Sequence, residues 1–419
     1  MEKSKFLKRD LMDQIVPLLG RKEIICVRGP RQAGKTTILK ALEELTTGRK
    51  AFLNMDNPEN RAALQQSPLD LVVRLNGNAP KLTLFLDEIQ RVPDSGEKLK
   101  LIFDEKDRVK MLVSGSSSLE LKTNVLSFLV GRMFLFDLLT FSFGEFLNSK
   151  DSGLYKIFSA KNASLIKFME KGGPIEKPAF NKEFTEYLNE YLVFGGFPEV
   201  IKSKSKKEKI TVLKNITSLY LEKDIVSFFK IEDTSKFESV LKMLAFNCAN
   251  ILNASSIGSD AGLTTFRLLE YLNMLSNTYI IELVNPFHKN MTTELKKSKK
   301  LYFLDLGQRN ALLDNFSDPS KRTDSGQLAE NFVFRELKTK GYKIKYWRTS
   351  GKAEVDFVIE TKTGIVPIEV KLGRARLGRS FYSFIDTYKP DKAIVTTSGT
   401  FKKQIIGKTT VYFVPIFYF

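Results

Sequence analysis

The chain has 419 residues, of which 42% are hydrophobic and 27% are charged, as is typical of a folded globular protein, and this excludes disorder over most of its length. Lys and Arg total 66 against 48 Asp and Glu, so the formal net charge is +18. This excess favours a polyanionic partner such as DNA, although solubility and the binding of small phosphates would also explain it.

Rare residue types exclude several further classes of protein. The chain has two cysteines, Cys26 and Cys248, and one histidine, His288. Two distant cysteines predict no disulfide framework and a reducing, cytoplasmic location. Zinc sites and serine–histidine triads have too few residues to be built from. No apolar stretch approaches about 18 residues, so we expect no membrane partner.

The N-terminal third alternates short apolar runs with longer amphipathic ones. Strands are predicted at 23–28, 51–54, 81–87, 109–114 and 133–138, and a helix at 35–45. Strands that alternate with helices predict an α/β fold, in which a parallel sheet is covered by helices on both faces.

A glycine-rich loop lies between the first predicted strand and the first predicted helix. It matches G-x-x-x-x-G-K-[ST] and comprises Gly29, Pro30, Arg31, Gln32, Ala33, Gly34, Lys35, Thr36 and Thr37. Such a loop points its backbone N–H groups at phosphate oxygens, and the helix N-terminus adds its positive end. We expect Lys35 to reach the β- and γ-phosphates and the Thr36 hydroxyl to ligate Mg²⁺. The loop therefore predicts a site for ATP and Mg²⁺.

A pair of carboxylates ends the strand predicted at 81–87. Asp87 is expected to hold the Mg²⁺ shell, and Glu88 to act as the catalytic base that polarises the attacking water. Asp-Glu is also a favourable start for a helix. The glycine-rich loop upstream makes the catalytic interpretation the stronger one.

Two further positions are weaker candidates for the same site. Ser114 or Ser116, at the end of the strand predicted at 109–114, would contact the γ-phosphate or the attacking water, but an ordinary serine-rich turn explains them equally well. Arg132 precedes the last predicted strand of this region. It is a candidate transition-state arginine, acting in its own subunit or across a homo-oligomer contact, and a surface ion pair is the alternative.

The middle of the chain is predominantly helical. Helices are predicted at 239–247, from about residue 254, and at 264–275, followed by a strand at 279–284. This order resembles a winged helix-turn-helix, whose third helix enters the DNA major groove in DNA-binding proteins. The third helix here offers only Arg267 as a clear cation, so a protein-binding role is the alternative.

A second group of chemically active residues lies in the last part of the chain. Glu330 falls on a helix predicted at 326–337, Asp356 on a strand at 353–359, and Glu369 and Lys371 on a strand at 365–371. Residues two apart in a strand share a face. Two carboxylates can hold Mg²⁺, and a nearby lysine can stabilise phosphate charge. A salt-bridged strand face is the alternative.

Basic residues follow this group within 371–379, with Lys389 and Lys392 beyond. They are candidates for phosphate contacts, and a solvated face is the alternative. The apolar run at 411–419 is interrupted by Pro415 and predicts a final core strand.

Several motifs together resemble the AAA+-type P-loop ATPases, and more specifically a bacterial and archaeal family of predicted ATPases with a C-terminal nuclease-like domain of unknown function. The motifs lie at 29–37, 85–90, 114–117, 141–146 and 191–198. The carboxylates and the lysine described above in the last part of the chain resemble the PD-(D/E)xK nuclease core. That resemblance implies Asp356 and Glu369 as metal ligands, Glu330 as the accessory carboxylate and Lys371 as the catalytic lysine.

Four domains are therefore expected: an ATPase domain at 1–150, a helical connecting region at 151–235, a winged-helix-like module at 236–290 and a nuclease-like α/β domain at 291–419. The leading hypothesis is an enzyme that hydrolyses ATP and couples its ATP state to nucleic-acid binding or cleavage. The alternative is a nucleotide-dependent switch or scaffold whose C-terminal domain is a non-catalytic binding module.

Overall fold

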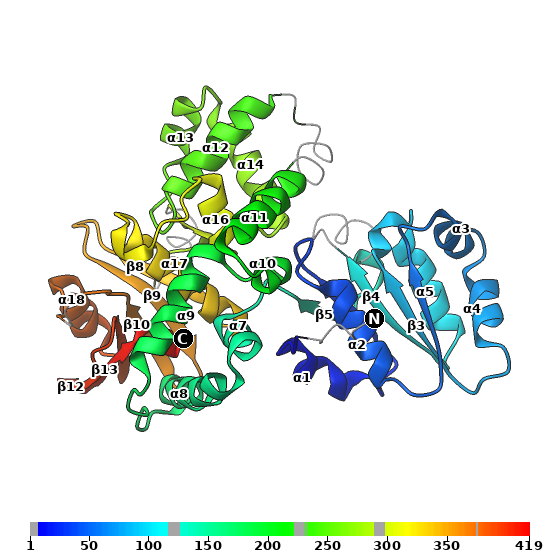
Figure 1. Cartoon of the computed structure of the whole chain (residues 1–419), viewed down its shortest axis with the longest axis horizontal. Helices are drawn as coiled ribbons and strands as arrows, with labels where there is room; N and C mark the ends of the chain where they lie inside the picture. The colour runs from blue at the N-terminus through cyan, green and yellow to red at the C-terminus, as the bar shows by residue number, and fades with distance from the viewer. Residues whose placement is uncertain (1–6, 116–125, 222–230, 232, 289–297, 374–375) are drawn as a thin grey trace. The chain divides into compact units, whose positions relative to one another are not determined.

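The computed structural model describes residues 7–115, 126–221, 231, 233–288, 298–373 and 376–419 (Figure 1). The chain divides into two compact units. The first contains Met1–Thr140 and Asn277–Tyr279, and the second contains Phe141–Ser276 and Ile280–Phe419. The first break thus falls between Thr140 and Phe141.

The first unit is a five-stranded parallel sheet with the strand order β2-β3-β4-β1-β5. Its strands are β1 (Ile24–Arg28), β2 (Arg49–Asn54), β3 (Leu82–Asp87), β4 (Val109–Gly115) and β5 (Met133–Asp137). Its α-helices are α1 (Leu11–Ile15), α2 (Lys35–Leu45), α3 (Pro58–Gln66), α4 (Pro68–Asn76) and α5 (Ser95–Glu105). The five predicted strands and the predicted helix are confirmed, with ends that differ by at most two residues.

Alternate residues of the central strands build two separate cores. Ile24 and Cys26 of β1 pack in a core that also holds residues of α3, α4 and α5. Ile25 and Val27 pack in a second core with residues of α1 and α2. Because successive side chains of a strand point to opposite faces, this pattern arises when helices cover both faces of a sheet. The predicted doubly covered α/β sheet is therefore confirmed.

The second unit contains a six-stranded mixed sheet with the order β12-β13-β11-β10-β9-β8. Its strands are β8 (Ile344–Arg348), β9 (Glu354–Thr361), β10 (Gly364–Glu369), β11 (Lys392–Thr397), β12 (Lys402–Ile406) and β13 (Thr409–Pro415). β8, β9 and β10 are antiparallel neighbours, whereas α18 (Arg379–Tyr388) joins β10 to its parallel neighbour β11. The C-terminal apolar run forms β13, which is buried between β11 and β12, so its prediction as a core strand is confirmed.

Helices make up most of the rest of the second unit. They are α7 (Phe143–Lys150), α8 (Ser152–Lys171), α9 (Asn181–Phe194), α10 (Pro198–Lys202), α11 (Lys206–Tyr220), α16 (Leu306–Leu312) and α17 (Ser325–Thr339). A further group comprises α12 (Thr234–Phe246), α13 (Ala254–Asp260) and α14 (Thr265–Asn277), which share a core with the antiparallel pair β6 (Ile281–Val284) and β7 (Lys300–Phe303). The three helices and the strand that follows them were predicted in this order, whereas the second strand, β7, was not predicted.

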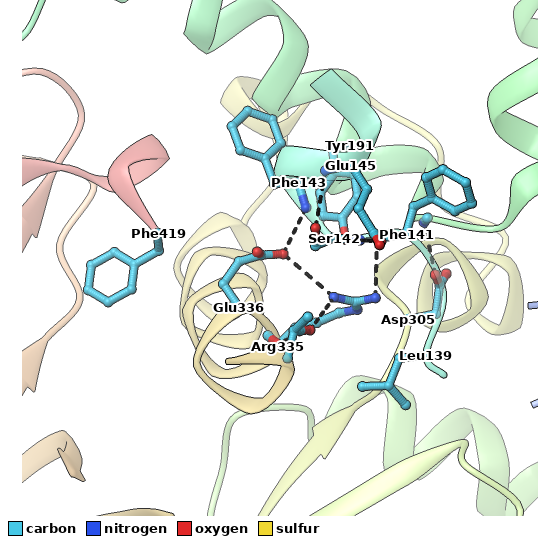
Figure 2. Close-up of polar contacts among 12 residues, drawn as sticks. Leu139, Phe141, Ser142, Phe143, Glu145, Tyr191, Asp305, Arg335, Glu336 and Phe419 are labelled. Carbon is cyan, nitrogen blue, oxygen red and sulfur yellow. Dashed lines mark hydrogen bonds and ion pairs between the residues drawn. The ribbon is translucent and has the colours of Figure 1, made fainter. Parts of the chain in front are cut away.

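Two of the sequence motifs meet beside α17, as Figure 2 shows for Phe141. The Phe141 N–H donates to the Gly196 carbonyl at 2.8 Å, and the Tyr191 hydroxyl donates to the Phe141 carbonyl at 2.6 Å. The buried Arg335 of α17 donates to the same carbonyl at 3.1 Å. A Cβ atom on Gly196 would lie 2.2 Å from the Phe141 oxygen, so the two motifs approach closely only because residue 196 is glycine.

The start of α7 is also tied to α17. Ser142 and Glu145 form a reciprocal capping box at the N-terminus of α7. Within that first turn, the Phe143 N–H donates to the Glu336 carboxylate at 3.0 Å (Figure 2). Each bond satisfies an N–H group that an α-helix cannot satisfy internally.

Candidate nucleotide site and carboxylate cluster

The glycine-rich loop connects β1 to α2 at the carboxyl edge of the first sheet. A Cβ atom on Gly29 would lie 2.0 Å from the Leu138 carbonyl oxygen, and Gly34 has a φ of +100°, so both positions require glycine. The Lys35 ammonium is buried and donates to the carbonyls of Gly29 at 3.0 Å and Pro30 at 2.8 Å. The lysine therefore lies folded back onto the loop that is expected to hold phosphate.

Asp87 joins the ends of two strands to the start of α2. Its carboxylate accepts from the Thr36 hydroxyl at 2.7 Å and from the Ser114 hydroxyl. The Ser114 oxygen also accepts from the Glu88 N–H at 3.1 Å. The carboxyl ends of parallel strands meet at one edge of a sheet, which is why Ser114 of β4 lies beside Asp87 and Glu88. The loop that follows β1 brings Thr36 to the same edge.

Glu88 itself has a left-handed backbone, with a φ of +56°. For a residue with a side chain this conformation is uncommon and marks sites where geometry is constrained. The Gln90 amide donates to the Glu88 carboxylate. The structure thus brings Lys35, Thr36, Asp87 and Glu88 to one edge, together with Ser114, whereas Ser116 lies outside the described residues.

The donor set at this edge fits Mg²⁺. A hydroxyl and a carboxylate, those of Thr36 and Asp87, are already adjacent, and both are hard oxygen ligands of the kind that Mg²⁺ prefers. Mg²⁺ is normally held by one or two protein groups plus substrate phosphates, so these two residues suffice with a bound nucleotide.

Arg9 was missed by the sequence analysis. It is buried, and its guanidinium donates to the carbonyls of Ala33 at 2.7 Å and Leu139 at 2.6 Å. It therefore ties the N-terminal segment to the glycine-rich loop. The sequence held no signal for this contact, because Arg9 is one of several cations in a basic segment.

A charged pair at two neighbouring strand ends was also missed. Arg28 ends β1 and donates to Asp137, which ends β5, at 2.7 Å. The Tyr279 hydroxyl donates to the same Asp137 oxygen at 2.8 Å. Burial raises the pKa of Tyr279, and the charge of Asp137 raises it further. Arg28 and Asp137 could have been identified from their positions at strand ends, whereas no local sequence pattern indicated Tyr279.

Arg132 lies at the other edge of the sheet. Its carbonyl accepts from the N–H of Ile24, the first residue of β1, whereas the glycine-rich loop follows the last residue of that strand. The guanidinium pairs with Asp104 at 2.9 Å and is about one-third exposed. Arg132 precedes its strand, and so it does not join Lys35 and Glu88 within this chain, contrary to the prediction for a single subunit.

A carboxylate cluster lies in the second unit, where α17, β7 and β9 meet. The ammonium of Lys300, the first residue of β7, lies 2.9 Å from Glu330, 2.6 Å from Glu354 and 3.9 Å from Asp356. The Tyr302 hydroxyl also donates to the Glu330 carboxylate, at 2.5 Å. Lys300 was not among the predicted site residues, because it follows a polar, basic segment that carries no motif.

The other predicted residues lie beside this cluster. The Val370 N–H donates to the second Asp356 oxygen at 2.7 Å, and Lys371 pairs with one oxygen of Glu369 at 2.7 Å. The other Glu369 oxygen is buried and has no hydrogen-bond partner. Lys371 follows the end of β10 and is 41% exposed, whereas Glu369 is buried. The four residues predicted from the nuclease resemblance are thus neighbours.

Burial and mutual repulsion shift the acid equilibria of this cluster. Burial raises the pKa of Glu330 to about 7, against the opposing charge of Lys300. Burial and then the charge of Glu369 raise the pKa of Asp356 to about 7. Raised pKa values of this kind are typical of carboxylates that lie close together and are shielded from water.

Glu330, Asp356 and Glu369, the predicted metal ligands, are not arranged as a three-ligand metal site. One oxygen of Glu330 accepts hydrogen bonds from both Lys300 and Tyr302. One oxygen of Asp356 accepts from the Val370 N–H. Within the described ranges, no group of three or more His, Cys, Asp or Glu side chains is arranged to hold a metal ion. The buried Lys300 ammonium faces Glu330 and Asp356, whereas one oxygen of Glu369 is left without a hydrogen-bond partner.

The basic segment after β10 is only partly exposed. Arg376, Arg379 and Lys389 are exposed, and Arg374 lies outside the described residues. Lys392, by contrast, is buried and donates to the Met169 carbonyl at 2.6 Å. Lys392 also lines a pocket with Lys171, Lys403 and Lys408, so its role as a phosphate contact stays a prediction.

The cation of the third winged-helix-like helix is already engaged. Arg267 of α14 pairs with Glu270 at 2.8 Å, and its guanidinium lies 5.1 Å from the centre of the Tyr271 ring. The same helix exposes Phe266 and Leu269, which are 72% and 52% accessible. The helix that was expected to contact DNA thus exposes two large apolar side chains, and its arginine is paired with a glutamate.

Three family matches cover most of the chain. Residues 21–147 match an AAA domain, residues 185–319 a domain of unknown function (DUF8612), and residues 325–419 a second domain of unknown function (DUF4143). Among the described residues, no helix combines the length and the apolar character needed to cross a membrane.

Relatives from several organisms match most of this chain. An uncharacterized protein of Methanocaldococcus jannaschii is 26% identical over 85% of this chain and 76% of its own length. One from Haemophilus influenzae is 22% identical over 88% of both chains. One from Mycobacterium tuberculosis is 21% identical over 87% of this chain and 74% of its own length.

Solved structures resemble the chain only distantly. The ORC2 protein of Aeropyrum pernix with ADPNP and ADP has a TM-score of 0.33 and 13% identity, over 73% of this chain and 90% of that one. The Holliday junction branch migration motor RuvB of Thermotoga maritima has a TM-score of 0.31 and 16% identity, over 66% and 90%. Scores this low carry no argument, whereas the AAA match and the P-loop geometry coincide. Residues 21–147, which include most of the first unit, therefore match an AAA domain, and this part of the chain carries the glycine-rich loop at 29–37.

Proposed function

We propose that the first unit hydrolyses ATP with Mg²⁺ and that the second unit uses the ATP state to control a nucleic-acid contact. One observation carries the ATPase proposal: the Asp87 carboxylate accepts from both Thr36 and Ser114, and Glu88 is the next residue. In this proposal the Mg²⁺ ligand, Asp87, and the base, Glu88, are adjacent at the end of β3.

Each residue has a defined task in this proposal. Lys35 exchanges the carbonyls of Gly29 and Pro30 for phosphate oxygens, which are stronger acceptors because they are charged. Thr36 and Asp87 would hold Mg²⁺, which screens the phosphate charge. Glu88 orients the attacking water and accepts its proton.

Glu88→Gln tests this assignment. The amide keeps the size of the side chain but does not accept the proton, so we expect the rate of ATP hydrolysis to fall by about 100-fold or more. Binding of ATP should remain within about twofold. Glu97→Gln changes an exposed glutamate of α5 and is the matched control. Unchanged turnover in Glu88→Gln, with the protein folded, would overturn the assignment.

The nucleic-acid proposal rests on charge. The chain carries a net charge of +18, and the exposed Arg376, Arg379 and Lys389 lie in the second unit. Cations of this kind bind phosphates independently of base sequence. ATP hydrolysis should be measured with and without double-stranded DNA, with Glu88→Gln as the blank. Stimulation supports the coupling, and indifference to DNA contradicts it.

A second candidate function is a nucleotide-dependent switch that binds a protein. The observation in its favour is the surface of α14, where Phe266 and Leu269 are exposed and Arg267 is engaged by Glu270. If DNA neither stimulates hydrolysis nor binds at physiological salt, this second function replaces the first.

A further inference from the structure

The carboxylate cluster of the second unit is closed around a lysine. Lys300 is 2% exposed, and its ammonium lies within 3 Å of carboxylate oxygens on Glu330 and Glu354 and 3.9 Å from Asp356. A divalent cation held by Glu330 and Asp356 would share these oxygens with Lys300. Two cations that share ligands repel each other strongly where little water screens them. Lys300 and a metal ion therefore compete for one place.

The formal charges of the cluster nearly balance without any added ion. The carboxylates are those of Glu330, Glu354, Asp356 and Glu369. The cations are Lys300, Lys371 and Arg348, and Arg348 lies 3.3 Å from Glu354. Counted as fully ionised, the four carboxylates and the three cations sum to −1, and a divalent cation would change this formal sum to +1.

The fold holds Lys300 by both its backbone and its side chain. Its backbone is paired with Val284 in the β6–β7 ladder, and its side chain passes near the Tyr346 ring, with the ammonium 5.8 Å from the ring centre. Burial alone lowers the pKa of Lys300, but the carboxylates outweigh burial and raise it. The side chain is therefore a permanent cation at this place.

We propose that Lys300 is the resident cation of this cluster, and that the second unit binds no divalent metal ion there while Lys300 is present. The cluster then serves as a metal-independent ion-pair core that joins α17 to β7 and β9. This inference narrows the role of the second unit to binding, without metal-dependent cleavage of the bound partner. It concerns side chains outside the ATP site.

The test compares Mn²⁺ binding to nucleotide-free, full-length variants, measured by electron paramagnetic resonance. Wild type and Glu369→Gln should bind equal amounts of Mn²⁺. Lys300→Met, which leaves three carboxylates without their ammonium, should bind about one additional Mn²⁺ per chain. Its urea unfolding midpoint, followed by the fluorescence of Trp347 in the second unit, should also rise when Mn²⁺ is added.

Two further variants serve as controls for the loss of the Lys300 charge. Lys300→Arg retains the charge and should gain no Mn²⁺, and Lys345→Met removes a lysine of β8 that pairs with Glu360 outside the cluster. If Lys300→Met does not fold, the comparison of wild type with Glu369→Gln still decides. One more Mn²⁺ on wild type than on Glu369→Gln overturns the proposal, as does a folded Lys300→Met without a gain. No nucleotide is used, so either result leaves the ATPase proposal untouched.

Discussion

At the scale of single residues, the direction of a strand decides which charged side chains meet. Asp87 is the last residue of the buried strand β3 and therefore lies at the carboxyl edge, beside the glycine-rich loop. Arg132 precedes its strand and therefore lies at the amino edge. The two edges are separated by the five residues of β1, about 16 Å at 3.3 Å per residue.

Arg132→Ala tests this difference in position. Its pair with Asp104 is partly exposed, and such pairs contribute about 0–1 kcal/mol to stability. We expect the rate of ATP hydrolysis to stay within twofold of wild type, whereas Lys35→Ala should abolish nucleotide binding in a fluorescent-nucleotide titration. If Arg132→Ala instead hydrolyses ATP much more slowly than wild type, and this difference increases with protein concentration, the arginine acts across a subunit contact.

At the scale of elements, buried polar groups join helices that are distant in sequence. Arg309 of α16 donates to the Ala245 carbonyl of α12 at 2.9 Å and pairs with Asp324, the residue before α17. Arg322 pairs with the same carboxylate at 2.7 Å. Both guanidiniums are 1% exposed, so one carboxylate balances two buried cations.

Asp324→Asn should therefore destabilise the second unit by about 3–5 kcal/mol at pH 7, the usual cost of breaking a buried ion pair. Burial opposes ionisation of Asp324, but the bonds from Arg322 and Arg309 outweigh it and lower its pKa. The stabilisation is therefore complete above about pH 4 and is lost as the pH falls below that value, because the unfolded chain takes up the proton first.

Urea unfolding followed by Trp347 fluorescence measures this effect at pH 7 and at pH 3. Asp386→Asn, an exposed aspartate of α18, is the control and should change the midpoint little. An Asp324→Asn deficit of the same size at both pH values would contradict the assigned ion pair.

At the scale of the whole molecule, the net charge of +18 makes the affinity for nucleic acid depend on salt. Reversing Arg376 and Arg379 to Glu lowers the net charge from +18 to +14. If both contact phosphate, the slope of log affinity against log salt should fall by about 2, and DNA affinity by about tenfold or more at low salt.

The control for this prediction makes the same charge change in the first unit. Arg74 and Lys100 are exposed on α4 and α5, and their reversal to Glu also gives +14. Fluorescence anisotropy of a labelled duplex over a range of salt concentrations measures both variants. Equal losses in the two double variants would mean that only the net charge matters and that Arg376 and Arg379 form no particular contact.

The sequence by itself determined the nucleotide site and the alternation of strands and helices in the first unit. Both depend on local order: the loop from Gly29 to Thr36 carries its own phosphate-binding groups, and a strand's burial pattern shows its period within a few residues. The position of Asp87 at the same edge followed, because parallel strands end together. Glu330, Asp356, Glu369 and Lys371 were likewise found as neighbours from spacing and family resemblance.

Only the tertiary structure decided the partners of these side chains. Lys300 lies 30 residues before Glu330 in the chain, and Tyr279 is 142 residues from Asp137, so no local pattern connects either pair. The register of β6 with β7 places the Lys300 ammonium among the carboxylates. That placement changes a predicted metal site into a closed ion-pair cluster, because the charge of a buried group depends on whichever residues the fold brings within a few ångströms.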